Sequence, residues 1–329
     1  MKRFLAGLAT ATLLSVGTAS AAEPALIFDL GGKFDKSFNE AAYNGAERFK
    51  EETGGTYREF EIQNEAQREQ AIRRFAERGN SPIVATGFTA AAAMEKVAKE
   101  FPDIQFAIID SVVDAPNVRS IVFKEQEGSY LVGVLAAMKS ETGTVGFVGG
   151  MDIPLIKKFS CGYKGGAKSV SADINVLENM TGTTGAAWNN PVRGGELAKS
   201  QIDQGADVIF HAAGGTGIGV LQAAADAGKF GIGVDSNQNG LFPGSVLTSM
   251  VKRVDVAVYQ TFKDAADGNF TAGTQVLGLA ENGVDYAMDE NNADLVTEDM
   301  KAAVEQAKQD IIDGKVDVHD YLTDEACPY

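Results

Sequence analysis

The sequence predicts an α/β protein with two similar lobes, each a parallel sheet flanked by helices. Short apolar runs of strand length alternate with helix-length segments along the chain, which is typical of βαβ units and parallel sheets. Ten such runs are many for one open sheet, so two sheets of about five strands divide them better. A chain of 329 residues is also long enough for two domains of ordinary size.

The expected strands are short, mainly apolar runs of five or six residues. In chain order they are 25–30, 56–61, 82–86, 105–110, 118–123, 144–148, 174–179, 208–212, 231–235 and 246–250. The strand and helix count restarts at 140–143, which predicts a boundary between the lobes there.

Helices are expected between most of these strands, at 38–52, 66–78, 90–101, 128–140, 193–204 and 217–227. Ser37 can cap the first of them. The segment 259–267 is again helical, and the Gly- and Asn-rich sequence that follows predicts irregular structure to about residue 292. The last helix, 297–313, starts at Thr297 and ends just before Gly314.

Composition and charge exclude several classes of protein. The chain carries 29 Lys and Arg against 45 Asp and Glu, a net charge of −16, which argues against nucleic acid as a partner because a polyanion needs a basic face. The 44% of hydrophobic residues can form a sizeable core, so global disorder is not expected. Two cysteines cannot form a zinc ribbon or a disulfide-rich scaffold.

Residues 1–22 are interpreted as a cleaved secretory signal peptide. Lys2 and Arg3 precede an apolar stretch at 4–16, and small residues at 19–22 offer a cleavage site. The stretch is short for a membrane span, so an uncleaved anchor is the less favoured alternative. No cysteine stands at the cleavage site, which indicates no lipid anchor. Cleavage would take the net charge from −16 to −18.

Export changes the interpretation of the two cysteines. In an oxidising compartment Cys161 and Cys327 can pair, which would close a long loop and tether the C-terminal tail. Two free thiols are the alternative, and the sequence does not decide between them.

Polar residues follow several of the predicted strands. Ligands bind at the carboxyl ends of the strands in parallel α/β sheets, and the residues found there are Asp29, Asp110, Asp235, Lys252 and the glycines of 214–219. Each has a structural alternative, because an aspartate at a strand end often caps a helix and a lysine is usually solvated. Their joint occurrence in both halves of the chain predicts a shared cleft.

The glycine segment resembles a dinucleotide-binding motif, with Asp235 twenty residues after Gly215, and Tyr259 and Lys263 have the spacing of a short-chain dehydrogenase. However, these glycines lie two-thirds along the chain, and an exported protein is remote from the nicotinamide pool. His211 and His319 have no partner at metal-binding spacing. No catalytic centre, cofactor or metal site is therefore expected.

Several motifs together resemble one family of receptors. They are Asp35-Lys-Ser-Phe-Asn39, Tyr43-Asn-Gly45, Phe159-Ser-Cys-Gly-Tyr163, the glycines of 214–219, Ile232-Gly-Val-Asp-Ser236 and Leu247-Thr-Ser-Met-Val-Lys-Arg253. Over essentially the whole mature chain, the sequence is similar to the basic membrane protein family of transporter substrate-binding proteins, in its purine-nucleoside receptor branch.

This resemblance implies a type I periplasmic-binding-protein fold whose two lobes are joined by hinge crossovers and close over a ligand. The lobes would comprise 23–124 with 253–275, and 125–252 with 276–329. The resemblance further implies a monomeric periplasmic receptor that delivers a small molecule to an ABC permease.

The resemblance also implies a ligand and its contacts. A purine nucleoside or base would be sandwiched between Phe38 and Trp188, and its polar contacts would fall on Asp29, Asn39, Asp110, Gly215, Asp235 and Lys252. Relatives more often carry Phe where this chain has Trp188, and Asp where it has Phe34 or Asn237. A receptor for another flat heterocycle such as a flavin, or for a sugar, is the alternative within the class. A secreted Rossmann-like oxidoreductase or a hydrolase is the alternative outside it.

Overall fold

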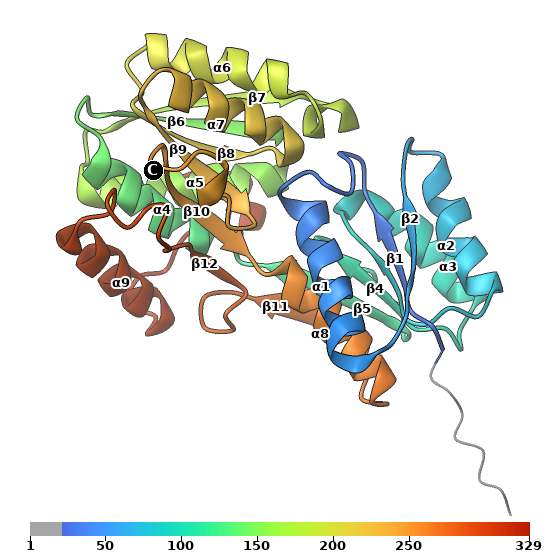
Figure 1. Ribbon diagram of the computed structural model, residues 1–329. Coiled ribbons are helices and arrows are strands. Elements are labelled where there is room, and N and C mark those ends of the chain that lie inside the picture. The colour runs from blue at the N-terminus through green and yellow to red at the C-terminus, as the bar shows by residue number, and fades with distance from the viewer. Residues whose placement is uncertain (1–21) are drawn as a thin grey trace, which may run out of the picture.

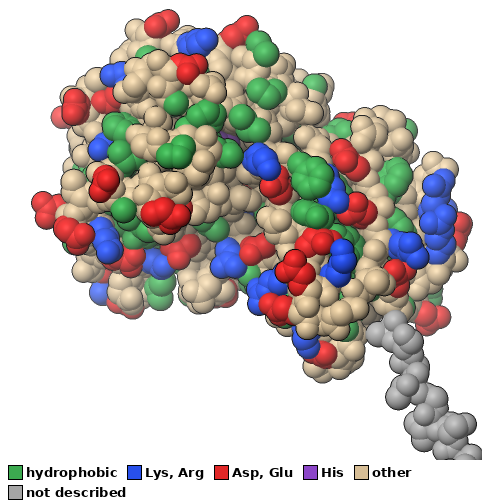
Figure 2. All heavy atoms as spheres, in the orientation of Figure 1, with side chains coloured by type: hydrophobic (Ala, Val, Ile, Leu, Met, Phe, Trp, Pro, Cys, Tyr) green, Lys and Arg blue, Asp and Glu red, His purple; other side chains and the backbone are tan. Residues whose placement is uncertain are grey.

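The computed structural model describes residues 22–329, so the predicted signal peptide lies outside the described residues except for Ala22. The chain forms two α/β lobes that lie side by side (Figure 1). Within residues 22–329, no helix is both long and apolar enough to cross a membrane. On the face shown in Figure 2, basic side chains are interspersed with acidic ones.

The first lobe contains a six-stranded sheet in which every neighbouring pair is parallel, in the order β11-β5-β4-β3-β1-β2. Its strands are β1 (Ala25–Phe28), β2 (Arg58–Glu61), β3 (Ile83–Ala85), β4 (Phe106–Ile109), β5 (Val118–Phe123) and β11 (Gly273–Leu277). Alternate residues of a strand point to opposite faces. Accordingly, Leu26 and Phe28 pack in the core that includes α1 (Phe38–Thr53) and α8 (Val254–Ala266), whereas Ala25 and Ile27 pack with α2 (Gln67–Glu77) and α3 (Ala91–Glu100).

The second lobe contains a sheet in the order β12-β10-β9-β8-β6-β7. Its strands are β6 (Thr144–Met151), β7 (Asn175–Gly182), β8 (Val208–Ala212), β9 (Phe230–Asp235), β10 (Val246–Lys252) and β12 (Val284–Tyr286). All neighbours are parallel except β12, which runs antiparallel to β10. Helices α4 (Glu125–Lys139), α5 (Pro154–Val170) and α9 (Glu298–Ile312) pack with one face, and α6 (Pro191–Asp203) and α7 (Gly217–Asp226) pack with the other.

The two lobes are interleaved in the sequence. The chain passes from the first sheet to the second after β5, returns after β10, and crosses again after β11. Because α4 packs against α5 and β10, the change of lobe precedes α4, and the boundary predicted at 140–143 is wrong. On this packing we propose the lobe boundaries 23–124 with 253–275, and 125–252 with 276–329; β11 continues two residues past 275.

The α/β prediction with two mainly parallel sheets is confirmed, and all ten expected strands are present. Thr297 caps α9 by accepting a hydrogen bond from the backbone N–H of Met300. The irregular structure expected before residue 292 is a wrong prediction, because β11 and β12 lie there and bring each sheet to six strands. Both are short edge strands, and β11 is largely exposed, so neither has the continuous apolar run of a buried strand.

Helix α5 is absent from the sequence-based expectations. Its middle contains Gly162, Gly165 and Gly166, and glycine costs about 1 kcal/mol per residue relative to alanine inside a helix. The structure shows why two of them are there. A Cβ on Gly162 would lie 2.3 Å from the carbonyl oxygen of Gln126, and one on Gly166 would lie 1.9 Å from that of Tyr130. These glycines therefore let α5 approach the backbone of α4.

The C-terminal tail lies against α5. Cys161 of this helix and Cys327 of the tail are joined by a disulfide, with a Cα–Cα distance of 5.6 Å. Asp320 is 3.3 Å from the buried Lys158 Nζ of the same helix. The tail is thus held at two points on a helix that also lines the site described next.

Candidate functional site

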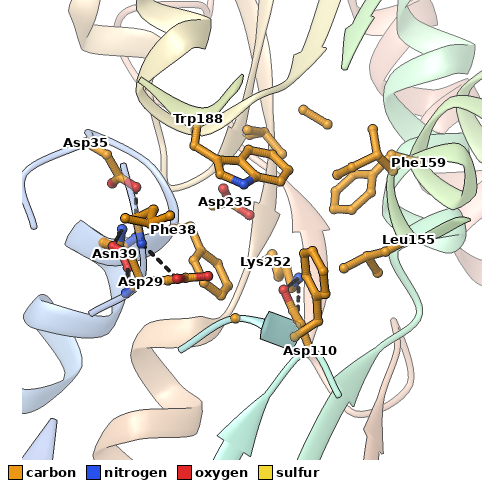
Figure 3. Close-up of a pocket in the computed structure, with 17 residues that line it drawn as sticks. Asp29, Asp35, Phe38, Asn39, Asp110, Leu155, Phe159, Trp188, Asp235 and Lys252 are labelled. Atoms are coloured by element: carbon orange, nitrogen blue, oxygen red, sulfur yellow. Dashed lines mark hydrogen bonds and ion pairs between the residues drawn. The ribbon is translucent and has the colours of Figure 1, made fainter. Parts of the chain in front are cut away.

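A cavity that is partly open to solvent lies between the lobes at the carboxyl ends of their strands (Figure 3). Seven of the eight residues predicted to contact a ligand line it: Asp29, Phe38, Asn39, Asp110, Trp188, Asp235 and Lys252. The eighth, Gly215, does not line the cavity, whereas its neighbour Gly214 does. The glycine segment therefore lines the cavity at Gly214, one residue before the predicted position.

Aromatic side chains enter the cavity from both lobes. Phe38 is the first residue of α1 in the first lobe, and Trp188 ends a short 3-10 helix, η2 (Gly185–Trp188), in the second. Both rings point into the cavity (Figure 3). Phe88 and Phe159 add two further aromatic walls, and α5 also contributes Leu155 and Ile156. Sequence reasoning missed the apolar wall of α5 because it missed the helix.

Asp29 follows β1 and is held on both of its carboxylate oxygens. Arg68 Nη2 donates to Oδ1 at 2.6 Å, and the Thr89 hydroxyl donates to Oδ2 at 2.8 Å. Asn39 fixes the backbone of the same residue, since its Oδ1 accepts from the Asp29 N–H and its Nδ2 donates to the Asp29 carbonyl. This network aligns a carboxylate and an amide at the cavity wall.

Asp35, rather than Ser37, caps α1, so the prediction for Ser37 is wrong. The Asp35 carboxylate accepts from the backbone N–H groups of Ser37, Asn39 and Glu40 at 2.8–3.1 Å. Burial raises the pKa of Asp35 to about 6, although these hydrogen bonds lower it. Sequence reasoning quoted Asp35 as part of a motif but missed it as a cavity residue.

Ser37 instead joins the two lobes. Its hydroxyl donates to the carboxylate of Asp235 and lies 3.3 Å from the carbonyl oxygen of Val234. The Ser236 hydroxyl donates back to the Ser37 carbonyl at 2.9 Å, and Gln238 Nε2 donates to the Lys36 carbonyl at 2.8 Å. The structure is therefore a closed arrangement, in which a loop of each lobe is hydrogen-bonded to the other.

Lys252, the last residue of β10, is the buried cation of the cavity. Its Nζ lies 2.7 Å from Asp110 and 3.0 Å from Glu125, and about 5 Å from the ring centres of Phe38 and Phe123. Burial alone would lower the pKa of Lys252, but its carboxylate neighbours raise it above its usual value.

Glu125 lies behind this pair and was missed by sequence reasoning. Burial would raise its pKa, but Lys252 and Lys158 together lower it. Lys158 Nζ is 3.1 Å from Glu125, so a chain of alternating buried charges runs from Asp110 at the cavity to the C-terminal tail. The charge of Lys252 is thus balanced within the protein.

Two aspartates at the cavity have an unusual backbone conformation. Asp110 follows β4 of the first lobe with a φ of +72°, and Asp235 ends β9 of the second lobe with a φ of +62°. Such strain is commonly kept at functional sites. Burial raises the pKa of each carboxyl to about 6, and the field of Lys252 opposes this rise.

These groups define what the cavity can hold. Carboxylates accept hydrogen bonds from ligand N–H and O–H groups, and the aromatic rings provide flat faces for stacking. The arrangement suits a small, flat and largely uncharged molecule with several hydrogen-bond donors.

Comparisons with known proteins identify the family of the chain. The family model of PnrA-like ABC transporter substrate-binding proteins matches residues 22–320. A CD4+ T-cell-stimulating antigen of Listeria monocytogenes is 34% identical over 89% of this chain and 87% of its own length. An ABC transporter nucleoside-binding protein, BmpA, of Lactococcus lactis is 34% identical over 89% and 88%. A lipoprotein of Pyrococcus horikoshii is 37% identical over 80% and 68%.

Solved structures are similar over nearly the whole chain. A solute-binding protein of an ABC transporter system from Aeropyrum pernix superposes with a TM-score of 0.83 at 30% identity, over 90% of this chain and 92% of its own. Another from Conexibacter woesei gives 0.74 at 25% identity, over 91% and 99%. These neighbours confirm the periplasmic-binding-protein fold. The chain belongs to the family of PnrA-like ABC transporter substrate-binding proteins.

Proposed function

We propose that this receptor binds a purine nucleoside or purine base between its lobes and delivers it to an ABC permease. The observation that carries the proposal is the pair Phe38 and Trp188, which enter one cavity from different lobes beside several carboxylates. The relative from Lactococcus lactis, named as a nucleoside-binding protein, supports the same class of ligand.

The physical chemistry of the cavity suits this ligand. Stacking of a base on an aromatic side chain contributes about 1–3 kcal/mol. Asp29, Asp110 and Asp235 line the cavity, and each can accept a further hydrogen bond from a ring N–H group or a ribose hydroxyl, because an ionised carboxylate has about four lone-pair sites.

Transport would follow from closure. The hydrogen bonds between the loops of Ser37 and Ser236 hold the lobes together over a bound ligand, and the closed surface then docks on the permease. In this proposal the protein acts as a periplasmic monomer that is exported by a cleaved signal peptide.

Titration of the purified mature protein tests the ligand. Because Trp188 is the only tryptophan, stacking of adenosine, guanosine, inosine or adenine on it should quench or shift the intrinsic fluorescence in a saturable way. Riboflavin and simple sugars are titrated in parallel. Saturation by riboflavin or a sugar alone would replace the purine by that ligand, and NAD retained after purification would point to an oxidoreductase. A folded protein that responds to none of the purines contradicts the proposal.

A further inference from the structure

The ring of Trp188 rests on a glycine of the second lobe. A Cβ added to Gly150, in β6, would lie 2.1 Å from Cζ3, 2.5 Å from Cε3 and 2.9 Å from Cη2 of the indole. Approaches this short are excluded by van der Waals repulsion. The outer edge of the six-membered ring therefore occupies the space that the side chain of any other residue at position 150 would fill.

This contact is the visible reason for a glycine at position 150. Gly31 and Gly214 also border Trp188, but both have positive φ, +120° and +55°, so their backbone conformation already favours glycine. Gly150 lies in a regular strand and is not among the positive-φ residues of the described chain. Its backbone would accept alanine, and the conflict would come from the indole.

The edge of the indole that carries nitrogen is turned towards the cavity in Figure 3. An indole offers a wider stacking face than a phenyl ring and an N–H donor that phenylalanine lacks. Position 150 thus determines whether this ring, with its donor, can lie flat along the cavity wall.

We propose that Gly150 is a positioning residue for Trp188 and that this pair determines ligand specificity, favouring a flat ligand with a hydrogen-bond acceptor at the indole edge. The part of this proposal that concerns ligand specificity rests on the proposed function, whereas the part that concerns the position of the indole ring does not.

The effect of Gly150 on the position of the Trp188 ring is tested without any ligand. Gly150→Ala should displace the indole, shift the emission maximum of the sole tryptophan and increase its quenching by acrylamide. Gly182→Ala is the matched control, because a Cβ there meets only Ala187 Cβ at 3.7 Å, an ordinary contact. Emission and quenching of Gly150→Ala that match the wild type would overturn the proposal.

The specificity is tested by calorimetric titration with adenosine and guanosine of four proteins: wild type, Gly150→Ala, Trp188→Phe and the double variant. Displacement of the ring disturbs its stacking on a base, so binding should weaken by about tenfold in Gly150→Ala. Phenylalanine lacks Cζ3 and Cη2, so the added methyl should cost much less in the Trp188→Phe background. Equal losses in both backgrounds would contradict coupling between the two residues.

Failure of the ligand assignment is recognised separately. If the wild type binds neither nucleoside, the proposed function is wrong. The fluorescence measured without ligand still tests whether Gly150 positions the Trp188 ring. If Gly150→Ala is unstable, thermal unfolding of this variant is compared with that of the double variant. Instability of Gly150→Ala that Trp188→Phe relieves supports the steric conflict, and equal instability in both backgrounds overturns it.

Discussion

Phe38 occupies a position where the start of a helix meets the cavity. It is the first residue of α1, and the Asp35 cap immediately before it fixes the direction in which the helix begins. The ring is only partly buried and lines the cavity, so part of its surface remains available to a ligand. Its energetic role should therefore be in binding more than in folding.

We expect Phe38→Ala to weaken purine binding by about tenfold or more, since stacking contributes about 1–3 kcal/mol per base, with little change in thermal stability. Titration calorimetry and a melting curve measure the two effects. Phe34→Ala is the matched control, because Phe34 is 60% exposed and does not line the cavity. Normal binding by Phe38→Ala would exclude the aromatic sandwich.

Asp235 makes the stability of the ligand-free protein depend on pH. Burial raises its pKa from 3.8 to about 6, so between these values the folded protein holds a proton that the unfolded chain releases. The contribution of Asp235 to the free energy of unfolding is thus most favourable at low pH and decreases as the pH rises from about 4 to 6.

Asp235→Asn removes this dependence. Relative to the variant, the wild type should lose roughly 2–3 kcal/mol of unfolding free energy between pH 4 and pH 6, at about 1.4 kcal/mol per unit of pKa shift. Urea denaturation at several pH values measures the difference. Parallel curves for the two proteins would show that the closed structure does not perturb this carboxyl group.

At the scale of the element, α5 carries an apolar wall of the cavity and depends on glycine to reach α4. We expect Gly166→Ala to destabilise the protein by about 1–3 kcal/mol, because the added methyl lies 1.9 Å from the Tyr130 carbonyl oxygen and pushes the helices apart. Chemical denaturation measures the loss. Val170→Ala on the exposed end of the same helix is the control, and a stable Gly166→Ala protein would refute the close-packing argument.

The same helix shows where sequence reasoning reaches its limit. The strands Val118–Phe123 and Val208–Ala212 were predicted with their observed bounds, since a buried parallel strand is a mainly apolar run even where it includes a polar residue such as Arg119. The glycines of α5 lower its helix propensity, and their value appears only when α4 lies beside it. Helix α5 therefore depends on a tertiary contact with α4, which the local sequence does not encode.

The residues of the candidate site also divide into those that the sequence predicts and those that it does not. Residues at strand ends, such as Asp110, Asp235 and Lys252, were predictable because the ends of parallel strands gather at one edge. Asp35 and Glu125 were not, since their roles depend on which chain groups meet them after folding. Ser37 has the residue type of a helix cap, yet its hydroxyl is directed to the other lobe.

For the whole molecule, the disulfide ties the tail to the second lobe across 166 residues of sequence. Replacing both cysteines by serine should lower the free energy of unfolding by roughly 2–5 kcal/mol, because the unfolded chain regains the freedom of a long loop. Nucleoside affinity should change little, since neither cysteine lines the cavity. Urea denaturation of the variant beside the wild type with and without reductant measures the effect, and equal stability in all cases would contradict it.

The position of β11 has a consequence for how the protein is made. The first sheet is incomplete until β11, Gly273–Leu277, pairs with β5, by which point the whole second sheet except β12 has been synthesised. A chain that emerges from its N-terminus therefore cannot finish its first lobe before most of its second. Neither sheet corresponds to one continuous fragment of the chain, so a fragment that ends before β11 lacks an edge strand of both sheets.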